Sequence, residues 1–330
     1  MHIPDNYLSP ATCATLIAAM VPVWTVSLKK TRVQIKAKQA TVPLLGVGAA
    51  LAFLVMMFNV PVPGGTTAHA VGAVLLAILL GPWSACLAVS IALLIQAFIF
   101  GDGGILAYGA NVFNMGFIMP FVGYGVFALF KRYRHPQLGA FVGGYVGINF
   151  AALAASIELG LQPLIARSAS GAPLYNPYPL SVSVPAMVGV HLIVIGWLEA
   201  AVTWLVYRYV HSHAPEELYQ DPTPARGLAK FWLPGVIGLA VLSPLGLLAS
   251  GTAWGEWGQQ ELLHNLKADG LPAAIPRGMA HGFDWHAVMA DYGLSGISAP
   301  LGYLLSAATA LLLIALVVKL VEARHASKQA

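Results

Sequence analysis

Charged residues are scarce in this sequence. Only 9% of its 330 residues are Asp, Glu, Lys or Arg and 58% are apolar, whereas an ordinary soluble domain carries about 25% charged residues. So few charges cannot cover the surface of a soluble protein of this length, which excludes a water-soluble enzyme and a disordered chain. Only two cysteines are present, Cys13 and Cys86, and both lie in apolar runs, which excludes a disulfide scaffold. The composition predicts a polytopic membrane protein.

Apolar runs long enough to cross a bilayer recur along the chain, since a spanning helix needs about 20 such residues. The run 69–100 is too long for one span and is interrupted by Gly81-Pro82, which suits a turn between two shorter helices. The runs lie at roughly 8–28, 42–60, 69–100, 105–130, 138–160, 180–210, 231–250 and 300–320. We therefore predict an all-α membrane protein with about nine transmembrane helices.

The basic residues orient these helices, because cytoplasmic loops carry an excess of Lys and Arg. Nine alternating spans that begin outside leave only Arg167, Lys267 and Arg277 outside. The basic residues then placed in the cytoplasm are Lys29, Lys30, Arg32, Lys36, Lys38, Lys131, Arg132, Arg134, Arg208, Arg226, Lys230, Lys319, Arg324 and Lys328. We expect an extracytoplasmic N-terminus and a cytoplasmic C-terminus. We also expect no cleaved signal peptide, which would carry basic residues before its apolar run.

The predicted organisation has two membrane units. Residues 1–210 form a seven-span unit, 211–230 a polar cytoplasmic linker, and 231–330 a two-span hairpin with an outer loop at about 251–299. This loop is acidic and contains His264, His281 and His286. It is either a cation-attracting segment or a solvated connection.

Few residues within the spans offer chemistry. No phosphate-binding G-x-x-x-x-G-K-[ST] run occurs, and Glu158 and Glu199 are the only acidic residues in the spans. His191 and Glu199 are eight residues apart and share a helix face. We expect both to have a packing role. Asp102 lies in a Gly-Asp-Gly-Gly turn, where turn chemistry explains it.

The N-terminus, Met1-His2-Ile3-Pro4-Asp5, is the strongest candidate for a metal site. A bulky His2 should leave Met1 in place, so the α-amine, the residue-2 amide and the His2 imidazole can form fused chelate rings. Three nitrogens in a plane suit Ni²⁺ or Cu²⁺ better than Zn²⁺ or Mg²⁺. His69 is the natural fourth ligand, because the Pro- and Gly-containing loop before it lies on the same predicted side of the membrane. A hydrogen-bonded interfacial histidine is the alternative for His69.

Other polar or small residues could support this site or pack helices. Asn111 and Asn114 share one helix face and serve either to join helices or to support a ligand. Asp5 and Thr66 are further candidates for supporting the ligands. Two pairs of small residues permit close helix contact within this chain or with a partner, namely Ala14 with Ala18 and Gly46 with Ala50.

Four motifs together resemble the substrate-binding membrane component of energy-coupling factor (ECF) transporters for nickel and cobalt, the NikM/CbiM family. They are MHIPDNYLSP, PVPGGTTAHAVGA, FGDGGILAYGANVFNMGF and GVHLIVIGWLEAAVT. Residues 226–330 resemble the NikN/CbiN accessory component through SPLGLLASGTAWGEW and a PDGLE-like stretch at Ala268-Asp269-Gly270-Leu271. The sequence departs from these families at Asn6, where Gly is common, and at Ala268, where Pro is common.

The resemblance implies seven helices in the binding component and a metal held by the Met1 amine, the residue-2 amide, His2 and His69. It implies transported Ni²⁺ or Co²⁺, no prosthetic group and no ATP hydrolysis by this chain. The expected partners are a NikQ/CbiQ-like membrane scaffold and NikO/CbiO-like cytoplasmic ATPases, and no nucleic acid. The expected location is the cytoplasmic membrane of a bacterium or archaeon.

Two alternative functions remain open. A self-contained secondary permease for divalent cations would have to transport ions alone, and the sparse intramembrane carboxylates argue against it. A haem- or quinone-binding redox subunit needs paired histidines within spans, and His191 is the only histidine deep in one. A planar four-nitrogen site favours Ni²⁺ and can also hold Co²⁺.

Overall fold

The computed structural model describes residues 1–37, 41–63, 65–219 and 228–326. Lys38, Gly64, Arg226, Lys328 and residues 220–227 of the predicted linker lie outside the described residues. The α-helices are α1 (Pro10–Ala37), α2 (Thr41–Met56), α3 (Ala73–Leu80), α4 (Pro82–Ile95), α5 (Tyr108–Asn111), α6 (Met119–Arg132), α7 (Pro136–Ile165), α8 (Leu180–Val190), α9 (Gly196–His213), α10 (Leu228–Leu242), α11 (Gln259–Ala268), α12 (Arg277–Ala280) and α13 (Ala299–Ala326). Shorter elements are the π-helices η1 (Gln96–Phe100), η2 (Val112–Ile118) and η3 (His191–Ile195), and the 3₁₀ turns η4 (Pro215–Glu217), η5 (Ser243–Leu248) and η6 (Ala290–Tyr292).

The helical membrane architecture predicted from the composition is confirmed. Among the described residues, six helical segments are long and apolar enough to cross a membrane: Pro10–Ala37, Pro82–Phe100, Tyr108–Arg132, Pro136–Ile165, Leu180–His213 and Ala299–Arg324. Thr41–Met56 and Trp232–Leu248 are shorter apolar helices, and the eight residues of α3 rise only about 12 Å. Helices therefore form in every predicted run, but their lengths do not establish the predicted count of nine spanning helices.

The long apolar run 69–100 is broken where its sequence indicates. Gly81 adopts φ 81°, a left-handed conformation that only glycine takes readily, and Pro82 begins α4. The tyrosine ring of Tyr219 occupies the space that a Cβ at position 81 would need, at 2.7 Å. Gly81 thus ends α3 and leaves room for Tyr219, which lies in the polar segment after α9, to pack against the turn between α3 and α4.

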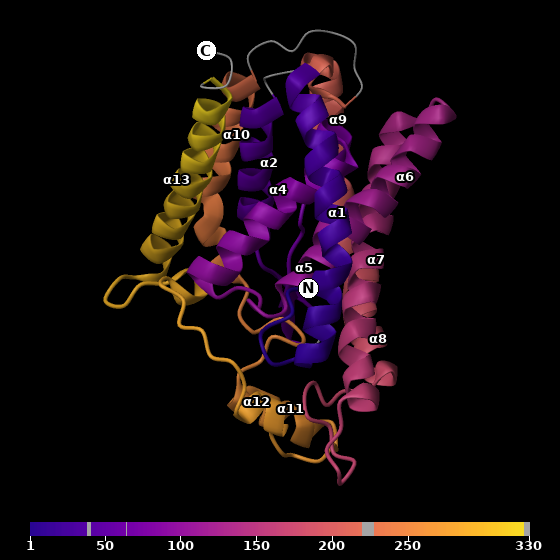
Figure 1. The fold of residues 1–330 in the computed structure, drawn as a ribbon, viewed down its shortest axis with the longest axis vertical. Coiled ribbons are helices and arrows are strands. Elements are labelled where there is room, and N and C mark those ends of the chain that lie inside the picture. The colour runs from indigo at the N-terminus through magenta and orange to yellow at the C-terminus, as the bar shows by residue number, and fades with distance from the viewer. Residues whose placement is uncertain (38–40, 64, 220–227, 327–330) are drawn as a thin grey trace.

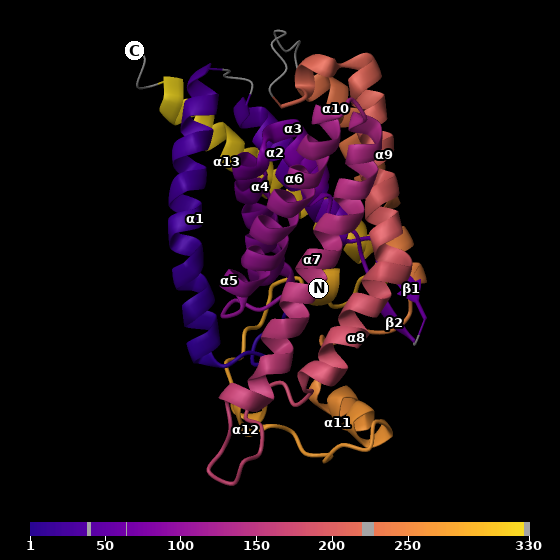
Figure 2. The same ribbon diagram turned by 90° about the vertical axis from the view of Figure 1, so that its right-hand side faces the viewer.

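The helices form one elongated bundle with two different ends. Figure 1 shows the C-terminal ends of α1, α6, α9 and α13 at one end and the helices α11 and α12 at the other. The former end carries the described Lys and Arg residues that follow these helices in the sequence. A two-stranded antiparallel hairpin, β1 (Val60–Val62) and β2 (Thr66–Ala68), lies beside α8 in the other half of the bundle, as Figure 2 shows.

The C-terminal hairpin packs on the first unit through α2, which contacts both α10 and α13. A Cβ at Gly46 would lie only 2.4 Å from Val318 Cγ2 of α13. The Gly46–Ala50 pair therefore lets two helices of this chain approach closely. Ala14 and Ala18 are instead exposed on α1.

Candidate metal site

The first nine residues fold into the bundle instead of continuing α1. Met1 and His2 are each 2% exposed and Ile3 is fully buried. The Ile3 amide donates to Asn111 Oδ1 at 2.7 Å, and Asn111 Nδ2 donates to the Ile3 carbonyl at 3.0 Å. This paired contact satisfies both buried backbone groups of Ile3. Asn111 therefore fixes the depth at which His2 lies.

Asp5 anchors the same segment from its other end. Its carboxylate accepts hydrogen bonds from the Ile105 amide at 3.0 Å and the Leu106 amide at 2.8 Å. Burial raises the pKa of Asp5, and these backbone donors oppose that rise. A Cβ at Gly104 would lie 2.5 Å from the Asp5 amide nitrogen. Asp5 and Asn111 thus join the N-terminal segment to residues 105–111 by side-chain hydrogen bonds.

His2 and His69 meet although 67 positions separate them. His69 Nε2 lies 3.2 Å from His2 Nδ1, and the ring centroids are 4.9 Å apart. His69 Nδ1 donates to the Ala70 carbonyl at 3.0 Å, which leaves the lone pair on Nε2. Two nitrogens that bind one ion at about 2 Å are about 2.8 Å apart in a square plane. The observed separation needs only a small adjustment to hold one ion between the rings.

The environment keeps both imidazoles neutral. Burial, assisted by the nearby N-terminal charge, lowers the pKa of His2 to about 3 and holds the pKa of His69 well below its usual value. Only a neutral imidazole can donate a lone pair to a metal. These histidines are therefore competent ligands at neutral pH.

The His69 loop is held by Glu199 of α9. The Glu199 carboxylate accepts hydrogen bonds from the Val71 amide at 2.9 Å and the Gly72 amide at 3.1 Å. Glu199 therefore has a specific anchoring role, and our expectation of mere packing was wrong. A charged side chain within an otherwise apolar span was the signal available in the sequence.

Asp102 also belongs to this cluster, so turn chemistry was an incomplete explanation. Asp102 Oδ1 lies 3.1 Å from His2 Nδ1. On its other side, Asp102 Oδ2 accepts from Gln96 Nε2 at 3.2 Å and from the Tyr292 hydroxyl. Gln96 begins the π-helix η1, a distortion that is common at functional sites.

The C-terminal unit completes the walls of the site. Met1 N lies 3.5 Å from Glu256 Oε1, and burial raises the pKa of Glu256. Thr66 donates its hydroxyl to the Thr252 carbonyl at 2.9 Å. Thr66 thus joins the hairpin to the second unit, and it lines a small cavity together with Met1.

A cavity of about 460 Å³ opens beside these groups. Its lining includes His69, Pro4, Thr67 and Tyr303 together with four carboxylates, Asp102, Glu256, Glu261 and Asp291. Its negative charge would raise the local concentration of cations next to His69. We call this cavity the acidic vestibule.

Backbone nitrogens are needed to complete a metal site here. Within the described ranges, no group of three or more His, Cys, Asp or Glu side chains converges as a metal cluster. The remaining donors beside the two imidazoles are the buried Met1 amine and the His2 amide. This arrangement can supply four nitrogens without a carboxylate cage.

Comparison with known proteins identifies the two units. Residues 2–217 match the family model of CbiM, the cobalt uptake substrate-specific transmembrane region. This chain belongs to the CbiM family. Residues 229–324 match the PDGLE domain, so the predicted fusion of two components is confirmed.

Close relatives share this fusion. The probable fused nickel transport protein LarMN of Lactiplantibacillus plantarum is 57% identical, and the match covers 97% of each chain. The fused nickel transport protein NikMN of Rhodobacter capsulatus is 46% identical over 93% of each chain. A crystal structure of a truncated transition metal transporter is 57% identical with a TM-score of 0.62, covering 64% of this chain and 99% of that one. The chain is thus a multi-pass membrane protein of the nickel and cobalt transport class.

Of the other candidate residues, Asn114 and the three histidines of the outer loop lie away from the site, whereas His191 lies close to Met1. Asn114 donates to Glu158 Oε2 of α7 at 2.8 Å and makes no described contact with the N-terminal segment. His264, His281 and His286 of the PDGLE domain are all exposed and lie outside the lining of the acidic vestibule. His191 donates through Nδ1 to the Met187 carbonyl at 2.7 Å and lines a small cavity that also contacts Met1.

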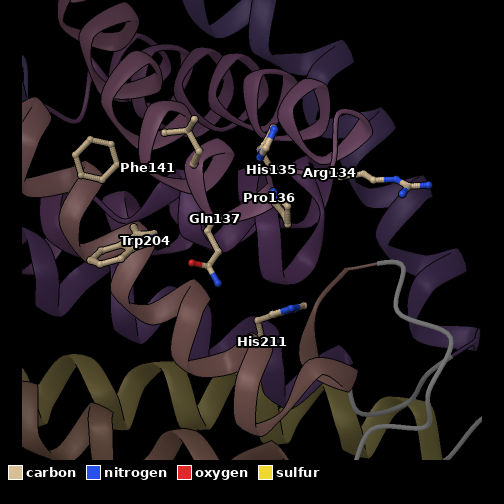
Figure 3. A pocket seen from close by; sticks show the side chains of 8 residues that line it. Arg134, His135, Pro136, Gln137, Phe141, Trp204 and His211 are labelled. Carbon is tan, nitrogen blue, oxygen red and sulfur yellow. The ribbon is translucent and has the colours of Figure 1, made fainter.

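A larger pocket lies at the opposite end of the CbiM unit. It has a volume of about 630 Å³ and lies between the α6–α7 connection and α9. Its lining includes His135, Gln137, Trp204 and His211, which Figure 3 shows around an open space. Two histidines line it, but among the described residues no group of three or more His, Cys, Asp or Glu side chains gathers there.

Proposed function

We propose that this protein is the metal-capturing membrane subunit of an ATP-driven ECF importer for Ni²⁺. The transported ion is held by the Met1 amine, the deprotonated His2 amide, His2 Nδ1 and His69 Nε2. The observation that carries this proposal is the 3.2 Å separation of the two imidazole nitrogens next to a buried N-terminus. Four nitrogens in one plane suit Ni²⁺ through its preference for square-planar coordination. The nickel transport proteins among the relatives support Ni²⁺ over Co²⁺.

Capture proceeds from the extracytoplasmic side in this proposal. The acidic vestibule concentrates the hydrated cation beside His69. The ion then displaces the protons of the Met1 amine and the His2 amide, because only a strongly bound metal can ionise a backbone amide. Glu256, 3.5 Å from the amine, is placed to take up one of these protons.

Transport itself requires partners in this proposal. The expected partners are the membrane scaffold and the cytoplasmic ATPases of an ECF transporter, in a bacterial or archaeal cytoplasmic membrane. The exposed Ala14 and Ala18 on α1 provide a surface of small residues on which a scaffold helix can pack closely. We further propose that 1–210 acts as the binding unit, 211–230 as its linker, and 231–330 as the accessory unit that covers the site.

Metal analysis of the purified full-length chain tests this proposal. The N-terminus is first verified by mass spectrometry, and binding of Ni²⁺ and Co²⁺ is measured by calorimetry. A two-residue extension before Met1 should abolish Ni²⁺ binding, because it removes the chelating amine and Met1 is only 2% exposed. The same two residues added after Ala330 serve as the control. Full Ni²⁺ affinity in the N-terminally extended protein would rule out the proposed ligand set.

A further inference from the structure

We propose that Tyr292 of the PDGLE domain is a positioning residue for His2, because its hydroxyl fixes Gln96 and Asp102 beside the imidazole. This inference rests on the proposed function, since it concerns how one ligand is held ready for the ion. Tyr292 and His2 are 290 positions apart and belong to different units. The positioning contact therefore makes the accessory unit part of the first unit's metal site.

Aromatic contacts hold the Tyr292 ring in place independently of its hydroxyl group. It is 6% exposed and stacks on Phe100 with ring centroids 5.1 Å apart, and it meets Phe53 edge-on at 6.1 Å. Asp291 and Tyr292 adopt φ angles of 52° and 60°, a conformation that non-glycine residues seldom take. Such strain persists only where the surroundings determine it, and it occurs often at functional sites.

The hydrogen atoms around Tyr292 leave only one arrangement for Gln96. The Tyr292 hydroxyl has a single hydrogen, which it donates to Asp102. Gln96 Nε2 has two, and donates one to Asp102 Oδ2 at 3.2 Å and one to the Tyr292 oxygen at 3.0 Å. Rotating the amide by half a turn would place Gln96 Oε1 against the Asp102 carboxylate. Tyr292 and Asp102 together therefore fix which way the Gln96 amide points.

The fixed amide supports the imidazole tautomer that a bound ion requires. In the metal-free chain His2 Nδ1 faces two acceptors, Asp102 Oδ1 at 3.1 Å and His69 Nε2 at 3.2 Å, so it carries the imidazole hydrogen. Gln96 Oε1 and His2 Nε2 are both buried and lack a hydrogen-bond partner among the described residues. When an ion occupies Nδ1, the hydrogen must lie on Nε2, and a hydrogen bond from Nε2–H to Oε1 would then satisfy both atoms. Nδ1 is the nitrogen that closes a chelate ring with the His2 amide, and metal-binding histidines commonly have such a partner.

The variant Tyr292→Phe tests the hydroxyl while keeping the ring and its stacking. We expect Ni²⁺ affinity in the full chain to fall about 10-fold or more, as is typical when a supporting partner of a metal ligand is lost. Tyr178→Phe is the matched control, because Tyr178 is also buried but lies outside the lining of the vestibule. Its hydroxyl donates to Asp269 Oδ2 at 3.0 Å and takes no part in the hydrogen bonds of Gln96 and Asp102 described above. This control should therefore bind Ni²⁺ like the unmodified chain.

Gln96→Leu and the double variant that combines Gln96→Leu with Tyr292→Phe separate a positioning role from a general loss of stability. If the hydroxyl acts through Gln96, the double variant should bind Ni²⁺ no more weakly than Gln96→Leu alone, because coupled residues are not additive. The metal-free Tyr292→Phe and Tyr178→Phe chains should melt at similar temperatures, because each loses a buried hydrogen bond from a tyrosine hydroxyl to an aspartate. Additive losses of affinity, or a weaker affinity that follows the melting temperature alone, would overturn the positioning role.

His2→Ala distinguishes this inference from the proposed function. Undiminished Ni²⁺ binding by His2→Ala contradicts the proposed ligand set itself. Loss of binding in His2→Ala, together with equal affinities for Tyr292→Phe and Tyr178→Phe, leaves the ligand set intact and overturns the role of Tyr292. Loss in His2→Ala and a selective decrease in Tyr292→Phe support both.

Discussion

Asn6 exchanges two hydrogen bonds with the backbone of Phe283, 277 positions later in the chain. Asn6 Nδ2 donates to the Phe283 carbonyl at 2.7 Å, and the Phe283 amide donates to Asn6 Oδ1 at 2.8 Å. Asn6 also has a φ of 69°, in the left-handed region that Asn tolerates better than other non-glycine residues. This explains the departure from the family at Asn6. The backbone turn suits the Gly that is common there, and the Asn side chain adds a contact with the PDGLE domain.

Substitutions at Asn6 should separate these two contributions. Asn6→Gly keeps the turn and loses the side-chain contact, so we expect about 1 kcal/mol of destabilisation from the lost hydrogen bonds. Asn6→Ala loses the contact and also strains the left-handed turn, which adds about 1–2 kcal/mol. In thermal unfolding of the metal-free chain, the unmodified protein should have the highest melting temperature, Asn6→Gly a lower one and Asn6→Ala the lowest. Equal melting temperatures for Gly and Ala would show that the turn is not maintained in solution.

Glu199→Gln should weaken metal binding without removing a ligand. The carboxylate accepts from Val71 through Oε2 and from Gly72 through both oxygens, whereas a neutral amide has one weaker acceptor oxygen and turns an NH₂ donor towards these N–H groups. Hydrogen bonds to a charged group contribute about 1.5–3 kcal/mol, so a loosened His69 loop should lower Ni²⁺ affinity at least about 10-fold. Calorimetry on the purified chain checks this decrease.

Glu158→Gln is the control for that experiment. Glu158 is the other intramembrane carboxylate identified in the sequence, and it binds Asn114 instead of the His69 loop. Its replacement should leave Ni²⁺ affinity unchanged. If both variants lose affinity equally, a general effect of intramembrane charge explains the result better than the anchoring of the loop.

The sequence drew attention to His2 and His69, which the structure brings together, but not to all of the residues that hold them. His2 stood out because it adjoins a free amine, and His69 because its loop was predicted to lie on the same side. Gln96 and Tyr292 could not be found in this way, because their contact joins two units through a π-helical turn and a left-handed backbone. Such contacts depend on the packing of distant segments, which local periodicity does not encode.

The metal-free protein should lose stability as the pH falls below 6.5, partly because of His2. Its pKa is about 3 in the folded chain, against 6.5 for a free imidazole, so the unfolded chain binds a proton that the folded chain excludes. Stability therefore rises with pH through this window and decreases on acidification. For one such group, the loss between pH 7 and pH 5 is about 2 kcal/mol.

Melting temperatures of unmodified and His2→Gln protein at pH 7 and pH 5 measure this effect. Glutamine does not titrate, so His2→Gln should lose less stability on acidification. His264→Gln is the control for the loss of one histidine elsewhere in the chain, because His264 is exposed. An identical pH dependence in all three proteins would mean that His2 is not buried as the structure describes.

A larger side chain should lower the melting temperature of the isolated protein at one pair of small residues and not at the other. Gly46 lies against Val318 within this chain, so Gly46→Leu should separate α2 from α13 and lower the melting temperature of the isolated protein. Overpacking of this kind typically costs about 1–3 kcal/mol.

Ala18 is exposed, so Ala18→Leu should leave the isolated protein unaffected. If the scaffold packs on this face, Ala18→Leu should instead reduce co-purification with the scaffold subunit while Ni²⁺ binding by the isolated chain is retained. Normal assembly of Ala18→Leu would place the scaffold contact on another surface of the CbiM unit.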